Sequence, residues 1–338
     1  MHDESLACHV VRSSPLTYDD APHPEVEDRP PHVRAASSLV LLVDRYAIVQ
    51  DDANFLALID PDSHEVESHP LPAGPKGLRV FDYDEGTGHH KLDLEACAVV
   101  PGTDERLLVA FGSGSAENRE WIVTVDWRGK EEPDTEMIEA PVFYETLREQ
   151  NAFSGSGLNV EGAIFVGDDR LRLFQRGNAE PTEQLDPVDA TGDLQWSALA
   201  AHLDAPDEHP PPELTNVVQY DLGTLHDVRL TFSDAVRYDG AVLFSASAED
   251  ETTGDVVGSV LGVIDETGAR LAELFDEDGT PFEGKVEGLS VHPDQPDRVS
   301  FVIDADASDE PSLIYEADLD GPWRRSQGEG ANEGRPQA

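Results

Sequence analysis

The sequence has little cysteine and no long apolar run. Its 338 residues include only two cysteines, Cys8 and Cys97, without the Cys/His spacing of a zinc site. A disulfide between them stays an open alternative that no other feature supports. No run of 18 apolar residues occurs, and the first residues lack the basic and apolar regions of a secretory signal. We therefore expect a cytoplasmic protein that does not contact a membrane.

Basic residues are also scarce, and lysine is the scarcest. Asp and Glu total 70 against 23 Lys and Arg, which gives a net charge of −47 and a pI of about 4.2. No basic stripe is available to neutralise phosphates, which argues against direct nucleic-acid binding.

A chain with this net charge repels itself in dilute buffer, whereas molar salt shortens the Debye length to roughly 3 Å and screens the repulsion. We expect a halophilic protein. An acidic module that binds basic partners is the alternative, but it would gather its acids on one face, and here they occupy nearly every loop.

Short β-rich runs follow one another along the chain, separated by Gly, Pro, Asp and Asn. Residues 45–50 (RYAIVQ), 106–112 (RLLVAFG) and 298–304 (RVSFVID) are typical. Runs of this length and β-branched content predict an all-β fold. One helix is expected, near 193–203 (DLQWSALAAHL), with Asp193 as its N-cap.

An acidic residue, a small residue and then an apolar strand form a motif that recurs. Glu95, Glu161 and Glu287 each begin a clear copy, Asp234 begins a looser one, and a degenerate first copy has Ser37 at this place. These positions are 53 to 73 residues apart, and each copy continues into a turn, a second strand and a polar patch. Units of this size predict the four-stranded antiparallel blades of a single β-propeller.

Five blades are the expected number, and six are expected if residues 17–34 or 177–225 hide a degenerate blade. The last copy has room for only three strands, so an N-terminal strand at residues 6–12 is expected to supply the fourth and close the ring without a free sheet edge. The propeller domain is predicted over residues 1–320. Two segments are predicted to lie outside the regular blades, an insertion at about 179–213 and a disordered tail at 321–338.

At these motifs the chain resembles bacterial propeller families grouped with the phytase-like, or esterase-like, propellers, in which an acidic residue followed by Gly opens the innermost strand. The resemblance extends from Leu94 to Asp306, in copies of three or four residues, and implies the architecture. The phosphatase or esterase labels of such groups come by analogy. Ser37 departs from the pattern, so a fully acidic ring is not expected.

The acidic residues of the motif are the main site candidates. The innermost strands of a propeller face its channel, so Glu95, Glu161, Asp234 and Glu287 are expected to converge. Two carboxylates about 6 Å apart repel by roughly 3 kcal/mol at an effective dielectric of about 20, so the group needs a cation, a shared proton or hydrogen-bond donors. Ca²⁺ or Mg²⁺ suits such oxygen ligands. The alternatives are structural clips that accept backbone N–H bonds from the next blade, and a catalytic acid or base.

A second polar patch follows the second strand of each copy and is expected at a mouth of the channel. In this acidic chain, solvated loop residues are the alternative interpretation. The patch comprises Asp52, Asn54, Asn178, Asp304 and Asp306.

Other motifs give weaker evidence of a functional site. His89 and His90 could join a metal or move a proton, although exposed loop histidines are the simpler interpretation. The Gly/Ser runs at 112–115 and 154–157 lack the context of a nucleophile elbow, and no phosphate-binding loop motif occurs.

Three functions remain open at this stage. The first is a non-catalytic binding or scaffold protein, a monomer or small homo-oligomer, with an acidic channel that holds a small molecule or cation. The second is a metal-dependent hydrolase of phosphate esters or lactones, in which a bound cation activates water. The third is an interaction protein that docks through the 179–213 insertion. No cofactor other than Ca²⁺ or Mg²⁺ is indicated.

Overall fold

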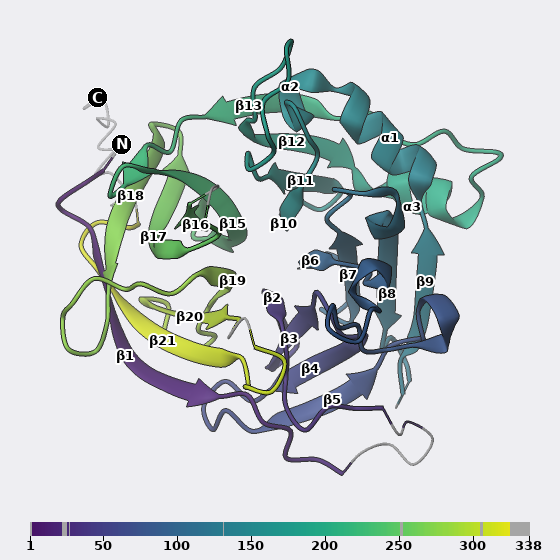
Figure 1. The fold of residues 1–338 in the computed structure, drawn as a ribbon, viewed down its shortest axis with the longest axis horizontal. Coiled ribbons are helices and arrows are strands. Elements are labelled where there is room, and N and C mark those ends of the chain that lie inside the picture. The colour runs from purple at the N-terminus through teal and green to yellow at the C-terminus, as the bar shows by residue number, and fades with distance from the viewer. Residues whose placement is uncertain are drawn as a thin grey trace, which may run out of the picture.

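The computed structural model describes residues 2–21, 26, 28–130, 132–250, 253–304 and 307–324. Its β-sheets stand around a central axis (Figure 1), and the strands nearest to the centre are β2 (Ala36–Leu42), β6 (Leu94–Val99), β10 (Val160–Gly167), β15 (Val228–Tyr238) and β19 (Val286–Val291). The prediction of an all-β protein built from four-stranded antiparallel sheets is confirmed.

Three sheets have four strands each, connected in simple sequence order. The first contains β2 (Ala36–Leu42), β3 (Arg45–Gln50), β4 (Phe55–Ile59) and β5 (Val66–Pro70). The second contains β6 (Leu94–Val99), β7 (Leu107–Gly112), β8 (Trp121–Asp126) and β9 (Asp134–Glu139). The third contains β10 (Val160–Gly167), β11 (Arg170–Gln175), β12 (Asp189–Gln195) and β13 (Thr215–Tyr220).

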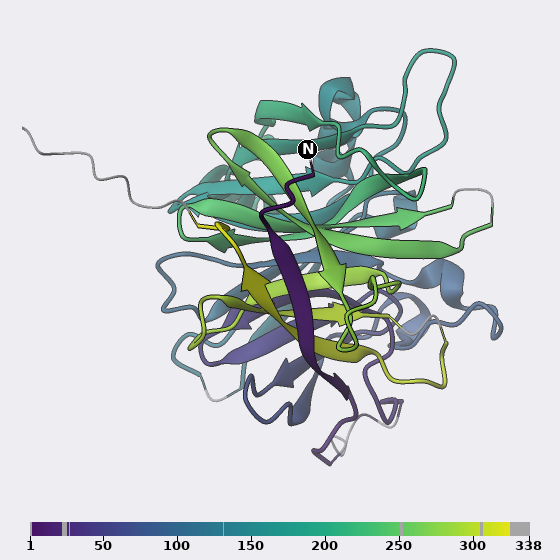
Figure 2. The same ribbon diagram turned by 90° about the vertical axis from the view of Figure 1, so that its left-hand side faces the viewer.

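The remaining strands form one curled sheet of nine strands, in the order β14-β15-β16-β17-β18-β1-β21-β20-β19. N-terminal β1 (Ala7–Pro15) pairs antiparallel with β21 along most of its length and meets β18 in parallel only at Cys8 and His9. Figure 2 shows purple β1 crossing this side of the molecule between green β18 and yellow β21. The other strands are β14 (Thr224–Leu225), β15 (Val228–Tyr238), β16 (Ala241–Glu249), β17 (Val256–Asp265), β18 (Gly268–Phe275), β19 (Val286–Val291), β20 (Arg298–Ile303) and β21 (Leu313–Asp320).

The strands nearest the axis contact one another in a cycle, β2 with β6, β6 with β10, β10 with β15, β15 with β19 and β19 with β2. Apolar side chains fill the space between neighbouring sheets. Phe174 of β11, Phe232 of β15 and Phe244 of β16 pack edge to face between the third sheet and the curled sheet. This packing holds the starts of the inner strands close together around the axis.

One helix was expected and three α-helices occur in the described residues. The expected one is confirmed as α3 (Trp196–Asp204), but the side chain at its N-terminus is not Asp193. Asp169 accepts hydrogen bonds from the backbone N–H and the hydroxyl of Ser197 instead. The two unexpected helices are α1 (Pro141–Glu149) and α2 (Asn151–Ser154), and short 3₁₀ turns occur at Pro75–Gly77, Gly88–His90 and Glu117–Arg119.

The segment 179–213 is not a plain insertion. It supplies β12, the third strand of its sheet, followed by α3. The strand escaped prediction because its sequence, DATGDLQ, is polar yet buried. Tertiary contacts satisfy its acids: Asp193 pairs with Arg172, and Asp189 accepts the backbone N–H groups of Gly177 and Phe232.

The last described residues pack against the start of β1 and the end of β21. Trp323, inside the segment predicted as a tail, is buried and donates its indole N–H toward the backbone oxygens of Ala7 and Asp320. Residues 325–338 lie outside the described residues. Cys8 and Cys97 are both buried free thiols. Among the described residues, no helix has the length and apolar character needed to cross a membrane.

Candidate functional site

Each of the five inner strands has a register shift that leaves one residue out of the ladder, after the first residue of β2, β6, β10 and β19 and further along in β15. A bulge re-aims the extra side chain. The shift in β15 lies between Phe232 and Asp234, so Ser233, and not Asp234, occupies the bulge there. The motif alignment was therefore one residue out of register in this copy. The bulged residues are Ser37, Glu95, Glu161, Ser233 and Glu287.

The small residue after each bulge has a steric reason. A Cβ atom added to Gly288 would lie 2.7 Å from the backbone nitrogen of Leu39 in the neighbouring inner strand. At the equivalent position of β15, the side chain of Asp234 forms hydrogen bonds with the neighbouring inner strands. Its Oδ2 accepts the backbone N–H of Leu289 in β19 at 2.8 Å, and the hydroxyl of Ser38 lies 3.5 Å away. Asp234 is 1 % exposed, and this burial raises its pKa well above the ordinary value. It therefore joins inner strands, as a structural clip does.

Two of the bulged glutamates have cationic partners. Arg176 Nη1 lies 3.1 Å from Glu161 Oε1, and Lys285 Nζ lies 2.6 Å from Glu287 Oε1. Glu249 connects the two pairs, at 2.7 Å from Arg176 Nη2 and 3.7 Å from Lys285 Nζ. Burial raises the pKa of Glu287 to about 7, although Lys285 acts against this shift. The result is a largely neutralised network on one side of the axis.

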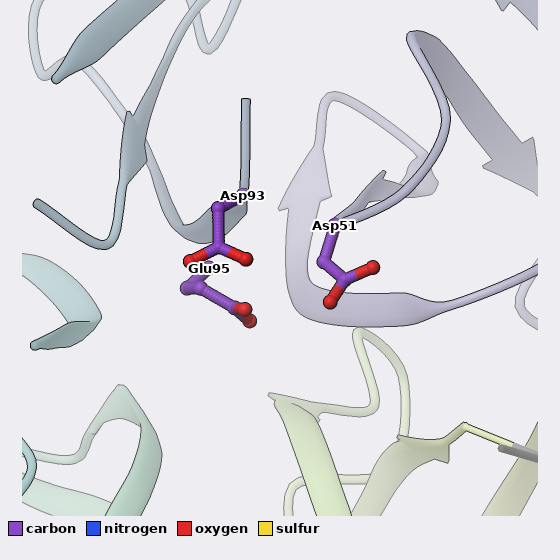
Figure 3. Close-up of side chains that lie close together, drawn as sticks. All are labelled: Asp51, Asp93 and Glu95. Atoms are coloured by element: carbon purple, nitrogen blue, oxygen red, sulfur yellow. The ribbon is translucent and has the colours of Figure 1, made fainter. Parts of the chain in front are cut away.

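The other side of the axis is more acidic. Asp51, Asp93 and Glu95 each offer a carboxylate oxygen, and these oxygens lie within 4.8 Å of one another. Asp51 follows β3, whereas Asp93 and Glu95 come from the start of β6, and Figure 3 shows the three carboxylates converging on one space. We call these residues the acidic trio. Lys91 Nζ contacts two of them, at 2.5 Å from Asp51 Oδ2 and 2.7 Å from Asp93 Oδ1.

Glu95 is the member of the acidic trio without a fixed partner. Within the described residues it has no hydrogen-bonded or ion-paired partner. Burial, reinforced by the negative charges of Glu161 and Asp93, raises the pKa of Glu95 well above its ordinary value. Burial also raises the pKa of Asp51 to about 6. A carboxylate placed among others in this way must take up either a proton or a cation.

A cavity of about 370 Å³ opens beside Asp51 of the acidic trio. Arg34 is part of its lining and pairs with Asp52 at 2.7 Å and Asp82 at 3.3 Å. The Tyr83 side chain, 67 % exposed, lies at the rim. The lining also includes Ala35, Asp51, Phe81, Asp84, Gly88, Lys91, Asp304, Ala307 and Ser308. The wall therefore carries charges of both signs with an excess of carboxylates.

The structure places some of the expected mouth residues at the cavity and others away from it. Asp52 and Asp304 line the cavity. Asn54 does not, because it is buried and its side-chain amide donates to the Pro72 carbonyl at 3.0 Å. Asn178 is exposed and accepts a hydrogen bond from Asn159 at 3.1 Å. Asp306 lies outside the described residues.

The sequence analysis did not identify the basic residues of this site. Lys91, Arg176 and Lys285 lie among the carboxylates. A signal was available, because two of only four lysines stand within four residues of a motif glutamate. The pair His89 and His90, a candidate metal ligand in the sequence, has its ring centroids 3.9 Å apart with the rings tilted by 46°, and it does not belong to the acidic trio.

Comparison with solved structures finds chains of similar extent at low identity. Glutaminyl cyclase from Myxococcus xanthus is 13% identical, with 94% of this chain and 97% of that chain covered and a TM-score of 0.45. A mannose phosphorylase from Leishmania mexicana, solved with phosphate, is 12% identical over 91% and 88%, with a TM-score of 0.41. A putative gluconolactonase is 11% identical over 95% of both chains, with a TM-score of 0.38. At these scores no argument about activity rests on the similarity.

No curated protein matches the sequence. One family model does, described as a family of unknown function, DUF6929, and it aligns with residues 32–319. The alignment runs from just before β2 to the end of β21 and therefore includes every inner strand and the whole acidic trio. The chain belongs to the family of unknown function DUF6929.

Proposed function

We propose that this chain is a five-bladed, closed propeller that binds a hard divalent cation, Ca²⁺ or Mg²⁺, at the charged end of its channel. The main support for this proposal is the acidic trio, whose carboxylate oxygens lie within 4.8 Å of one another. Glu95 has no hydrogen-bonded or ion-paired partner in the described part of the chain. Hard cations take carboxylate oxygens at 2.0–2.6 Å, a geometry that a small movement of three such groups provides. The cavity beside the trio supplies room for water or a small ligand on the open side of the cation.

The five-blade count rests on the cycle of inner strands from β2 to β19, and the closure rests on the pairing of β1 with β21. Each blade then presents one bulged residue to the axis, three of them glutamates and two of them serines. A rigid ring of this kind places ligands from different blades at one depth.

The local charge supports a cation. Asp51, Asp93 and Glu95 contribute three negative charges when ionised, and Lys91 and Arg119, which lies 3.0 Å from Asp93 Oδ2, contribute two positive charges. One negative charge remains at the trio and attracts a cation. Glu161 and Glu287 are already balanced by Arg176 and Lys285, so they are not expected to act as ligands.

The first test is the metal content of the protein purified in molar KCl, followed by calorimetric titration with Ca²⁺ and Mg²⁺. We expect one bound cation per chain. Glu95→Gln should weaken binding by at least about tenfold, because a metal-ligating carboxylate is lost. Asp52→Asn is the matched control: it removes one charge from the wall of the same cavity without touching the trio, and should weaken binding far less.

Lys91 gives a second test with the opposite sign. A cation must share Asp51 and Asp93 with the Lys91 ammonium, so Lys91→Gln should strengthen cation binding. If Lys91 and the trio serve only to hold the blades, Lys91→Gln lowers the melting temperature and no cation binds at any concentration tested. That result, or an equal loss in Glu95→Gln and Asp52→Asn, would overturn the proposal.

A metal-dependent hydrolase of phosphate esters or lactones is the second candidate function. One observation favours it: the cavity of about 370 Å³ opens beside Asp51 of the trio, so a substrate there would lie close to water activated by the proposed cation. The resemblance to phytase-like propellers makes phosphate esters the first substrates to screen. Turnover that is lost in Glu95→Gln but retained in Asp52→Asn would support hydrolysis, and absence of turnover in a cation-loaded protein would leave binding as the function.

A further inference from the structure

The opposite end of the channel has a different chemical character. Beyond the bulged residues, the inner strands line an apolar cavity of about 260 Å³. Its walls come from four of them, β2, β6, β10 and β15, and from the turn after β6. We call this cavity the apolar mouth. Val40, Leu41, Val99 and Val236 line it and are only partly buried, so apolar surface is left open to solvent there.

An arginine stands in the wall of the apolar mouth. Arg237, near the end of β15, is exposed and has no hydrogen-bonded or ion-paired partner in the part of the chain that the structure describes. An unpaired arginine is unusual in this protein, because the sequence has 70 acidic and only 23 basic residues. Most of the described basic side chains pair with a carboxylate. The lining also contains one acid, Glu105, but no ion pair joins it to Arg237.

We infer that the apolar mouth binds a small amphipathic carboxylate, with its hydrocarbon body among the inner strands and its anionic group on Arg237. The volume corresponds to roughly nine water-sized groups, which fits an acyl chain of about eight carbons. Apolar surface supplies the affinity, and the guanidinium, which recognises planar carboxylates, supplies the orientation. This site is separate from the acidic trio and does not depend on whether a cation binds there.

The charge of the ligand follows from the same residues. An amphipathic cation would be repelled by Arg237 and would find Glu105, in the turn after β6, as the one acid of the lining, whereas an uncharged chain of the same length would gain only the apolar contacts. The expected order of affinity is therefore octanoate, then octanol, then octylammonium. This order is the reverse of what the net charge of −47 alone would favour.

The experiment is a calorimetric titration of the whole chain with octanoate, octanol and octylammonium, at the lowest KCl concentration that keeps it folded. We expect octanoate to bind at least about fivefold more tightly than octylammonium. Across hexanoate, heptanoate and octanoate the affinity should rise about fourfold per methylene, the ratio that corresponds to about 0.8 kcal/mol per buried CH₂. Equal binding of octanoate and octylammonium, or no rise with chain length, would overturn the inference without any variant being made.

Two arginine variants distinguish binding at Arg237 from a general effect of the protein's charge. Arg237→Gln should weaken octanoate binding by about twofold to fivefold, the range for an exposed charge pair, and leave octanol binding unchanged. Arg106→Gln is the matched control, because Arg106 is also exposed and unpaired within the described residues but is not part of the lining. Equal losses in the two variants would mean that octanoate senses only the overall charge.

A filling variant tests the cavity itself. Val99 is partly exposed in the apolar mouth, so Val99→Trp occupies space without forcing a larger side chain into a closed core. Octanoate binding should fall by more than about tenfold, while Ca²⁺ titration at the other end of the channel is unchanged. If Val99→Trp fails to fold, the chain-length series and the Arg237→Gln comparison still decide the matter. Octanoate binding that survives in a folded Val99→Trp protein would place the ligand elsewhere.

Discussion

The Asp234 carboxylate of β15 accepts the backbone N–H of Leu289 in β19, and the two inner strands are joined at 2.8 Å by this single side chain. The same oxygen lies 3.5 Å from the hydroxyl of Ser38 in β2. Ser38 in turn accepts the backbone N–H of Cys97 in β6 at 3.1 Å. Polar side chains at the position after the bulge thus connect four inner strands that are distant in sequence.

Asp234→Ala should lower the free energy of unfolding by about 1–3 kcal/mol, because a buried N–H group loses its acceptor. Thermal unfolding in molar KCl measures the change. Glu136→Ala, an exposed acid of β9, is the control and should change stability by no more than about 0.5 kcal/mol. Equal effects would show that Asp234 contributes only through its charge.

Arg176 is the cation on which the neutralised side of the channel depends. It is 5 % exposed and pairs with both Glu161 and Glu249. Arg176→Met should cost about 3–5 kcal/mol of stability, because the buried Glu161 loses its ion-paired partner and Glu249 keeps only Lys285, at 3.7 Å. Adding Glu161→Gln should restore part of this loss, and a double-mutant cycle gives the coupling free energy. Losses that add without coupling would contradict the pairing.

The sequence was informative where strands are apolar and uninformative where they are polar. Runs such as 106–112 and 298–304 were predicted correctly because buried strands carry β-branched residues on both faces. β9 (Asp134–Glu139) and β12 were missed, since most of their residues are charged, polar or Gly, and only pairing with the preceding strand identifies them as β. The missed helix α1 buries Phe143, Tyr144 and Leu147 on one face, a pattern too short to stand out from the surrounding strands.

The candidate site shows the same division. The motif glutamates could be predicted because they repeat, but the register of the fourth copy could not, because Ser233 and Asp234 are both polar and only the strand ladder distinguishes them. Asp51 and Asp93 are more than 40 residues apart in sequence, and the contact of β3 with β6 brings their regions together. That contact is a tertiary relationship with no local signal.

The pH dependence of stability should carry the signature of Glu287. Its pKa is about 7 in the folded protein and ordinarily about 4.5, so the folded state binds the extra proton between these values. Stability from this group is therefore fully present below about pH 4.5 and is lost as the pH rises through 7. Glu287→Gln removes the titration, so its stability relative to the wild type should increase steadily across that window. A constant difference between the two proteins from pH 5 to 8 would contradict the shifted pKa.

Salt should stabilise the protein strongly. With a net charge of −47, raising KCl from 0.01 to 1 M shortens the Debye length from about 30 to about 3 Å and screens the repulsion between surface carboxylates. A variant with four exposed acids replaced by Gln, at Glu136, Glu139, Glu145 and Glu149, should show a smaller rise in melting temperature over this range. An identical salt response in the variant would mean that salt acts through something other than these surface charges.

The pairing of β1 with β21 should be required for folding if it closes the ring. Deleting residues 2–15 removes Cys8 and Val10 from a buried cluster and leaves the edges of β21 and β18 unpaired. Open edges of this length promote association, so we expect aggregation or a loss of cooperative unfolding. Deletion of residues 325–338, which begin after the packed Trp323, is the control and should leave the melting temperature unchanged. Supplying residues 2–15 as a separate peptide should restore cooperative unfolding to the shortened chain, because the ladder to β21 depends on pairing rather than on covalent connection. A shortened chain that unfolds like the full one without the peptide would show that the remaining strands hold the fold by themselves and that β1 is an accessory strand.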